Sequence, residues 1–184
     1  MITKDKDVHV NQGDIFKNVE YIESIKIDNG EITVNKIIYP LAVVLTQECD
    51  LVQDYSSRSK SGSNNDKKLI SIILAPMYNF EHFILGKHLS ELNMTMRVFS
   101  PKKDSTENRN LIQNETPRYH YFDFGDEVDL PKSVVDFKHY FTVNLAEIES
   151  KIDEDYICAL SPLYRERLVQ RFSNYLSRIG LPEK

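Results

Sequence analysis

The stretch IKIDNGEITV, residues 25–34, predicts a β-hairpin. Apolar and polar residues alternate in IKI and again in ITV, which is the pattern of strands with one apolar face. Between them, Asn29-Gly30 readily accepts the positive φ angles that a tight hairpin turn requires. We therefore expect two antiparallel strands joined at this turn, and the rest of the chain is interpreted outward from them.

Further strand signals follow the hairpin. Residues 41–45 (LAVVL) are too short and too rich in β-branched residues for a helix, which predicts a central strand with Pro40 at its start. Residues 69–74 predict a second buried strand, ended by Ala75-Pro76. Alternating aromatics predict a strand over 118–124, and apolar runs predict others over 134–143 and 156–159.

Two helices and three loops complete the predicted order. Apolar spacing predicts one helix over 79–92, with Gly86 as its weak point, and a C-terminal helix from the cap Ser161 to Gly180. Residues 46–55 are expected to leave the sheet as a turn, and 101–110 to form a charged loop. The Ser-rich segment 56–68 is expected to be a flexible polar loop.

Composition limits the classes of protein to consider. A chain of 184 residues, 41% of them hydrophobic, predicts one domain spanning 1–184 with a mainly β (α+β) fold. The longest apolar run is too short for a membrane span, the charged N-terminus shows no secretory signal, and we expect a cytoplasmic protein with reduced thiols. A net charge of −5 disfavours a dedicated DNA-binding domain.

The order of these signals resembles the MazF/PemK-like toxin family. The matching pieces are Gly13-Asp14-Ile15, residues 40–46, 72–76 and 134–143, and the closing helix. The resemblance implies a small SH3-like β-barrel with hairpin insertions, one middle helix and a C-terminal helix. It also implies a metal-independent endoribonuclease that works as a homodimer on RNA.

Two catalytic positions of that family are changed in this chain. The family's charge-stabilising Arg falls at Tyr39, and no suitable hydroxyl follows Pro76. We therefore expect a non-catalytic or weakly catalytic barrel that binds nucleic acid or protein. The alternatives are an endoribonuclease with relocated catalytic groups and a purely structural subunit of a multi-protein complex. The segments LTQECDL and RFSNYLSRIGLP resemble uncharacterised bacterial proteins near defence or mobile-element operons, which implies a component of such a system.

The polar cluster after residue 45 supplies the first candidate site. Cys49 is a candidate nucleophile if a histidine such as His120 lies beside it, and otherwise a small half-buried residue at a strand exit. Gln47 and Asp50 are candidate binding residues at the rim of a barrel cleft, or they satisfy loop backbone groups. Cys49, Asp50, Asp54 and His120 match no known metal-ligand spacing, so no metal and no cofactor is predicted.

A second candidate site lies in the aromatic strand. Arg118, Tyr119 and His120 suit the stacking of single-stranded bases, and Arg118 with His120 are the candidate catalytic groups of a relocated ribonuclease. The alternative is an aromatic strand that packs into the core with Arg118 at its solvated end.

The last candidate surface is the C-terminal helix. Four arginines oppose one acid over residues 161–180, and Arg167 and Arg171 lie beside its apolar stripe. They are candidates for binding RNA phosphate or an acidic protein partner. Solvated arginines that flank a core stripe explain the pattern equally well.

Overall fold

The computed structural model describes residues 1–4, 6–58, 60, 65–100 and 105–178, which form two compact units. The arm unit comprises Ile2–Pro76 and Tyr140–Ser161, and the aromatic unit comprises Met1, Met77–His139 and Pro162–Lys184. The expectation that residues 1–184 form a single domain stays a prediction.

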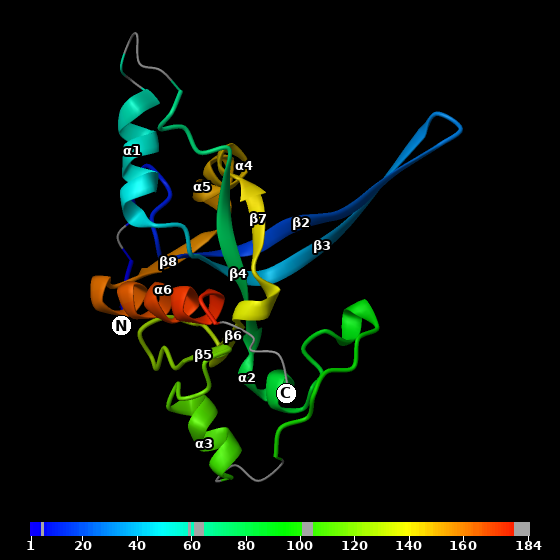
Figure 1. Ribbon diagram of the computed structural model, residues 1–184, viewed down its shortest axis with the longest axis vertical. Helices are drawn as coiled ribbons and strands as arrows, with labels where there is room; N and C mark the ends of the chain where they lie inside the picture. Colours follow the sequence, from blue (N-terminus) through cyan, green and yellow to red (C-terminus); the bar gives the residue numbers. More distant parts are fainter. Residues whose placement is uncertain (5, 59, 61–64, 101–104, 179–184) are drawn as a thin grey trace, which may run out of the picture. The chain divides into compact units, whose positions relative to one another are not determined.

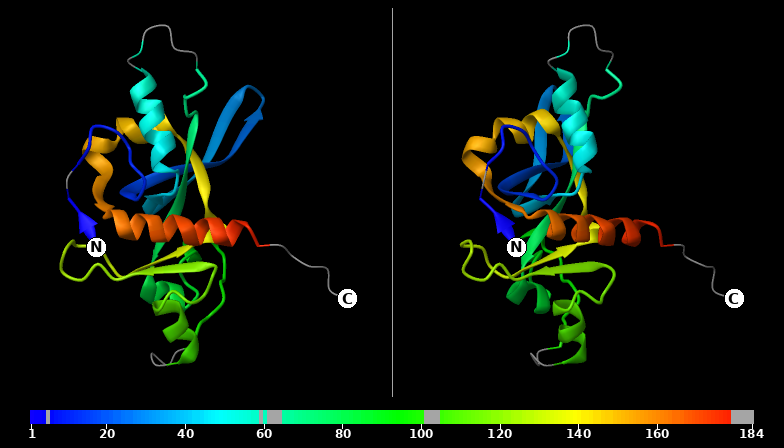
Figure 2. Two further views of the ribbon diagram at one scale, coloured as in Figure 1. Left: turned by 60° about the vertical axis from the view of Figure 1, so that its left-hand side comes forward. Right: turned by 90° about the vertical axis from the view of Figure 1, so that its left-hand side faces the viewer.

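The arm unit is built on an antiparallel sheet that curls into a half-barrel (Figures 1 and 2). In spatial order, its strands are β1 (Ile2–Thr3), β8 (Tyr156–Leu160), β2 (Asp14–Asp28), β3 (Glu31–Val44), β4 (Ser71–Asn79) and β7 (Phe141–Asn144). Its helices are α1 (Glu48–Arg58), α4 (Leu145–Ser150) and α5 (Ile152–Asp155). Residues 71–76 of β4 belong to this unit.

The core of the arm unit includes residues of this sheet and of two of its helices. Phe16, Ile72 and Leu74 are completely or almost completely buried there, together with residues from α4 and α5. Tyr39 is also buried, with its ring centroid 4.8 Å from that of Phe141, and burial raises the pKa of its phenol. Tyr39 is therefore a core aromatic residue of the arm unit.

The aromatic unit has a smaller antiparallel sheet and several short helices. Its strands, in spatial order, are residues 77–79 of β4, β6 (Ser133–Asp136) and β5 (Tyr119–Phe122). Its helices are α2 (Phe80–Ile84), η1 (Ser90–Leu92), α3 (Thr106–Ile112), η2 (Phe137–His139) and α6 (Pro162–Leu176). Tyr78, Phe83, Phe99 and Tyr119 form an aromatic core with Leu111.

The predicted mainly β class, the hairpin and the C-terminal helix are confirmed in these units. The fold is known at the level of a curled antiparallel half-barrel with helices, which is coarser than the predicted closed SH3-like barrel. The helix α6 ends at Leu176, before the predicted end at Gly180, which itself lies outside the described residues. Within the described ranges, no helix is both long and apolar enough to cross a membrane.

Two predicted strand boundaries are wrong because both prolines lie inside strands. Pro40 lies within β3, where it is exposed and faces Asn18, which has a φ of 53° and interrupts the ladder between the pairs on either side. A missing N–H is harmless at such an irregularity. Pro76 pairs with Ala42 inside β4, so the strand continues to Asn79.

The single strand predicted over 134–143 is also wrong, because it consists of β6, the turn η2 and β7. The carboxylate of Asp136 accepts a hydrogen bond from the backbone N–H of Lys138 at 3.0 Å, which stabilises a turn at this point.

The helix predicted over 79–92 is only one short helix, α2, followed by a loop and the 3₁₀ turn η1. Gly86 has a φ of +67°, and a Cβ there would lie 2.5 Å from the carbonyl oxygen of Met96. This close approach ends the helix and requires glycine. The charged loop predicted over 101–110 is replaced by α3 from Thr106, capped by the Ser105 side chain, and residues 101–104 lie outside the described part.

Candidate functional site

Six exposed apolar residues of the arm unit lie in the distal part of the β2–β3 hairpin, residues 20–38, which we call the arm. Figures 1 and 2 show it extending beyond the rest of its sheet. Asn29 and Gly30 have φ angles of 49° and 85°, as a tight type I′ turn requires, and Ile27 pairs with Ile32 next to this turn. The predicted turn is thus confirmed, and it sets the register of the whole arm.

One face of the arm carries most of its exposed apolar side chains. Residues paired directly across an antiparallel ladder share a face, so the pairs Ile25–Val34 and Ile27–Ile32 lie together. Ile22, paired with Lys36, and Ile38, paired with Glu20, continue the same face toward the base. These six apolar side chains are each between 50% and 74% exposed. We call this surface the apolar face; it is defined by Ile22, Ile25, Ile27, Ile32, Val34 and Ile38.

A β-bulge keeps Ile22 on the same face as Ile25. The register shifts between Ile22 and Ser24, which leaves Glu23 as an extra residue in β2. Strict alternation would place residues 22 and 25 on opposite faces, and the extra residue restores them to one face.

The opposite face of the arm is polar toward the turn and packs into the core at its base. Lys26 and Thr33 pair there, and the amide of Asn35 donates to the Ser24 hydroxyl at 3.0 Å. Nearer the base, the ring of Tyr21 lies 5.5 Å from that of Phe141 in the core. The arm is therefore held at its base, while its apolar face remains exposed to solvent.

One ion pair lies on the apolar face near the base. Lys36 Nζ and Glu20 Oε1 are 3.0 Å apart, and the hydrogen bond from Lys36 lowers the pKa of the Glu20 carboxyl. The two charges cancel, so the apolar face has no net formal charge.

Residues 46–55 leave the sheet, as predicted, but from Glu48 they form helix α1 instead of a turn. Acidic residues in the first turn and Arg58 in the last favour a helix through its dipole. Leu51, Asp54 and Ser57 recur every three residues and form its buried side. Residues 56–58 of the predicted flexible loop belong to this helix, whereas 59 and 61–64 lie outside the described residues.

Gln47, Cys49 and Asp50 are all exposed near the start of α1. The Gln47 carbonyl accepts the N–H of Asp50 at 3.2 Å. Cys49 Sγ lies 3.6 Å from Gln47 Oε1 and 3.8 Å from Asp50 Oδ1. These neighbours are oxygen acceptors, whereas a nucleophilic cysteine needs an imidazole or a cation beside it. Their position thus fits a helix start on the surface of the arm unit.

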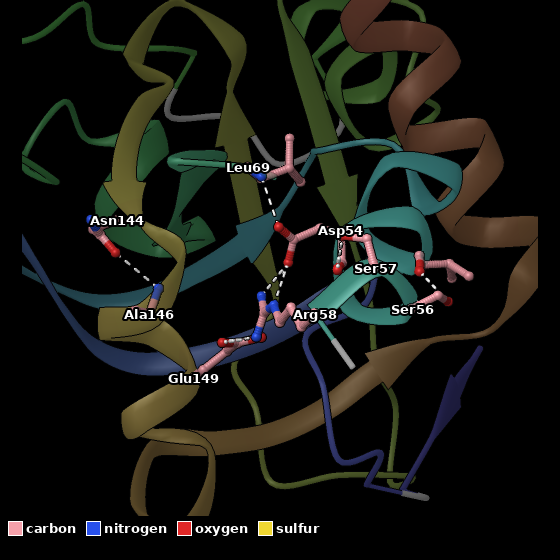
Figure 3. Close-up of polar contacts among 9 residues, drawn as sticks. Asp54, Ser56, Ser57, Arg58, Leu69, Asn144, Ala146 and Glu149 are labelled. Atoms are coloured by element: carbon pink, nitrogen blue, oxygen red, sulfur yellow. Dashed lines mark hydrogen bonds and ion pairs between the residues drawn. The ribbon is translucent and has the colours of Figure 1, made fainter. Parts of the chain in front are cut away.

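The other end of α1 holds an ionic network, centred on the buried Asp54, that was not predicted from the sequence (Figure 3). Asp54 is 2% exposed, and its Oδ2 accepts from Arg58 Nε at 2.7 Å while its Oδ1 accepts from the backbone N–H of Leu69 at 2.8 Å. Arg58 also donates to Glu149 of α4 at 2.7 Å, which raises the pKa of the guanidinium. The i,i+4 spacing of Asp54 and Arg58 was the available sequence signal.

This network borders a pocket of about 290 Å³ that is lined in part by Lys68, Asn144 and Ala146. The Asn144 side chain accepts from the Ala146 N–H at 2.9 Å and caps α4 (Figure 3). Since the carboxylates here already pair with Arg58 or backbone N–H groups, the arrangement joins α1, α4 and the start of β4. We interpret it as structural.

The predicted base-stacking residues of β5 are committed to the core of the aromatic unit. Arg118 Nε donates to Asp136 Oδ1 at 2.8 Å, which raises the pKa of the guanidinium, and its Cζ lies 5.1 Å from the ring centroid of Tyr119. Tyr119 packs against Phe83 and Phe99. This arrangement matches the alternative interpretation of a core strand with Arg118 at its end.

His120 is 3% exposed and lies 4.6 Å, between ring centroids, from Phe122. Burial, reinforced by Arg171 and Arg167, lowers its pKa to about 3. The imidazole is consequently neutral near pH 7 and is poorly suited to act as a general acid there.

A second polar chain in the aromatic unit joins three elements and has no simple sequence signal. Tyr78 Oη lies 3.0 Å from His139 Nδ1, and His139 Nε2 lies 3.6 Å from Asp136 Oδ2. Burial lowers the pKa of His139. The chain continues to Arg118 through the carboxylate of Asp136, which supports η2 on the sheet of this unit.

The arginines of α6 occupy different environments. Arg171 donates to the carbonyl oxygens of Thr116 and Tyr119 at 2.9 and 2.8 Å, and burial lowers its pKa. Arg167 is exposed, and Arg178 lies 4.0 Å from the ring centroid of Tyr175. Arg171 is therefore a structural tie to β5, whereas Arg167 remains available at the surface of the described unit.

The aromatic unit also contains a pocket of about 600 Å³, bordered by Phe80, Ile84, Tyr121 and Lys132. Lys132 forms an ion pair with Asp123 at 2.8 Å. In the part of the chain that the structure describes, no cluster of three or more His, Cys, Asp or Glu is arranged to hold a metal ion.

Neither the protein-family models nor the curated protein sequences contain a match to this chain.

Proposed function

We propose that this chain is a non-catalytic, divergent MazF/PemK-like barrel that serves as a protein-binding component of a bacterial defence or toxin–antitoxin-type system, and that the apolar face of the arm is its contact surface. The kinship rests on the order of sequence pieces quoted above and is compatible with the curled half-barrel of the arm unit. The exposed apolar face carries the functional part of the proposal.

The size of the apolar face supports a role in protein contact. Its six side chains lie together, and isolated exposed hydrophobic residues would not form such a contiguous surface. Burying a Val or Ile side chain completely contributes about 1.5–3 kcal/mol, so covering the exposed fractions of these six contributes roughly 5–10 kcal/mol. A matching apolar surface on a partner contributes a similar amount. The sum of the two contributions is comparable to the ~4–15 kcal/mol that association costs.

The contacts and the burial of the predicted catalytic groups support a non-catalytic role. Arg118 is paired with Asp136, His120 is buried with a lowered pKa, and Tyr39 fills a core position. A developing phosphorane requires cationic or hydrogen-bonding groups directed at it, and these residues are directed at core partners instead.

Site-specific photocrosslinking in cells tests the proposal. A benzophenone amino acid replaces Val34 on the apolar face or, as the matched control, Thr33 on the opposite face of the same strand. We expect protein adducts from position 34 and few or none from position 33. Absence of adducts at 34, or equal adducts at both positions, contradicts a specific protein contact there.

A ribonuclease assay tests the catalytic alternative. Purified protein is incubated with a mixed RNA pool without added metal, beside its Arg118→Ala and His120→Ala variants. We expect no cleavage by any of the three proteins. Cleavage that both variants abolish would instead support the relocated-ribonuclease alternative.

A further inference from the structure

We infer that the apolar face of the arm binds the same face of a second copy of this chain, so that two arms pack face to face about a twofold axis. This inference rests on the proposed function, because it names the partner for the same surface. An isologous contact requires a patch that is complementary to itself. The apolar face meets this requirement in its charge, its area and its shape.

The charges of the arm favour a second copy over a charged partner. Glu20 and Lys36 lie on the apolar face and cancel, whereas Lys26 and the pair Asp28–Glu31 lie on the opposite face. Two copies can therefore approach through this face without an excess of like charge meeting across the contact. A twofold axis also allows the acid of one arm to meet the base of the other.

The apolar face supplies part of the area that a dimer contact needs. Since a fully exposed Val or Ile side chain offers about 60–120 Å² of apolar surface, the six exposed fractions give roughly 200–400 Å² per copy. A standard interface buries about 800 Å² per partner, and close to 65% of a homodimer interface is apolar. The six side chains thus supply a large share of the apolar area on each side.

The direction of the side chains selects face-to-face packing over pairing at the strand edges. Edge pairing would extend the arm's sheet but leave Ile25, Ile32 and Val34 in water. Face-to-face packing removes all six side chains from water, at the ~10 Å spacing of stacked sheets. β-Branched side chains on a pleated surface interdigitate well in such a layer.

Sedimentation equilibrium of the purified chain tests the inference. We expect a species with twice the monomer mass of 21.4 kDa, in reversible exchange with the monomer. The triple variant Ile25→Thr/Ile32→Thr/Val34→Thr keeps β-branched residues in the strands while removing apolar surface. It should raise the dissociation constant at least ~100-fold. The control Lys26→Thr/Glu31→Thr, on the opposite face, should change it by about twofold or less.

A variant with a shortened arm is a second test, which remains informative if the triple variant does not fold. Replacing residues 23–35 by Asn-Gly joins Ile22 to Lys36 through a tight turn and keeps Tyr21 on the core. This variant should be folded by circular dichroism and monomeric.

The outcomes separate this inference from the proposed function. A wild-type chain that stays monomeric at ~100 µM overturns self-association, as does a dimer that survives both arm variants or an assembly that grows beyond two copies. Crosslinks in cells from Val34 to a different protein would then leave the proposed function intact. The absence of any adduct from Val34 would remove the proposed function.

Discussion

Lowering the pH from 7 to 5 should destabilise the protein through its buried histidines, and His120 should carry a measurable part of the effect. The ordinary pKa of histidine is 6.5, whereas His120 in the folded chain has a pKa of about 3. Between these values the unfolded chain binds a proton that the folded chain does not bind. The contribution of His120 to stability is therefore complete above pH 6.5 and is lost as the pH falls toward 3.

The magnitude follows from the same pKa shift. One proton bound only by the unfolded state costs about 1.4 kcal/mol for each pH unit below 6.5, so His120 accounts for about 2 kcal/mol between pH 7 and pH 5. Burial lowers the pKa of His88 to about 4, and it lowers the pKa of His139 as well. The wild-type chain should consequently lose more stability than His120 alone explains.

Urea unfolding followed by circular dichroism at a series of pH values measures this effect. In the His120→Phe variant, the loss of unfolding free energy between pH 7 and pH 5 should be smaller than in wild type by about 2 kcal/mol. Because the readout is the difference between two pH values, an overall change in stability from the larger ring does not obscure it. The exposed His82→Gln variant is the control and should follow wild type. Parallel pH profiles for wild type and His120→Phe would refute the reasoning.

Three other predictions concern the arm, the ionic network and the thiols. Gly30→Ala should destabilise the turn by about 1 kcal/mol because Gly30 has a φ of +85°, with no contact to a new Cβ; amide hydrogen exchange should therefore accelerate within the arm only. Asp54→Ala should cost about 2 kcal/mol in urea unfolding, because it leaves the Leu69 N–H and part of Arg58 unpaired, whereas exposed Asp50→Ala should change stability by less than about 0.5 kcal/mol. Exposed Cys49 should react with maleimide in the native protein, and buried Cys158, whose pKa burial raises to about 11, should react only on unfolding.

Local signals predicted the hairpin and the last helix because both depend on neighbouring residues. The turn at Asn29-Gly30 needs only its own φ preferences, and Pro162 at the start of α6 needs only its fixed φ. Prolines misled the strand boundaries for a tertiary reason. Whether Pro40 ends a strand depends on Asn18 across the ladder, which the sequence around the proline does not reveal.

The candidate site could be predicted less well, because long-range contacts decide which polar groups remain available. Arg118 pairs with Asp136, 18 positions away, and Arg58 pairs with Glu149, 91 positions away. His120 is shielded from solvent by the core, and the alternation of residues in its strand does not show that both of its faces are buried. Helix α1 was missed because its sequence, ECDLVQDYSSR, is polar, and its buried side consists of Leu51 with two polar residues.

The sequence shows each apolar residue of the arm but does not show that all of them share one face. The bulge at Glu23 is the reason. Residues 25, 27, 32 and 34 alternate regularly, but Ile22 falls out of phase with Ile25 when every residue is counted. The extra residue brings Ile22 back into phase and adds local twist to the arm. This realignment does not add to the core, because the distal half of the arm does not reach the core of the arm unit. The extra residue brings Ile22 onto the face that Ile32, Val34 and Ile38 already share by alternation along β3, which extends the exposed apolar surface without adding to the core of the arm unit.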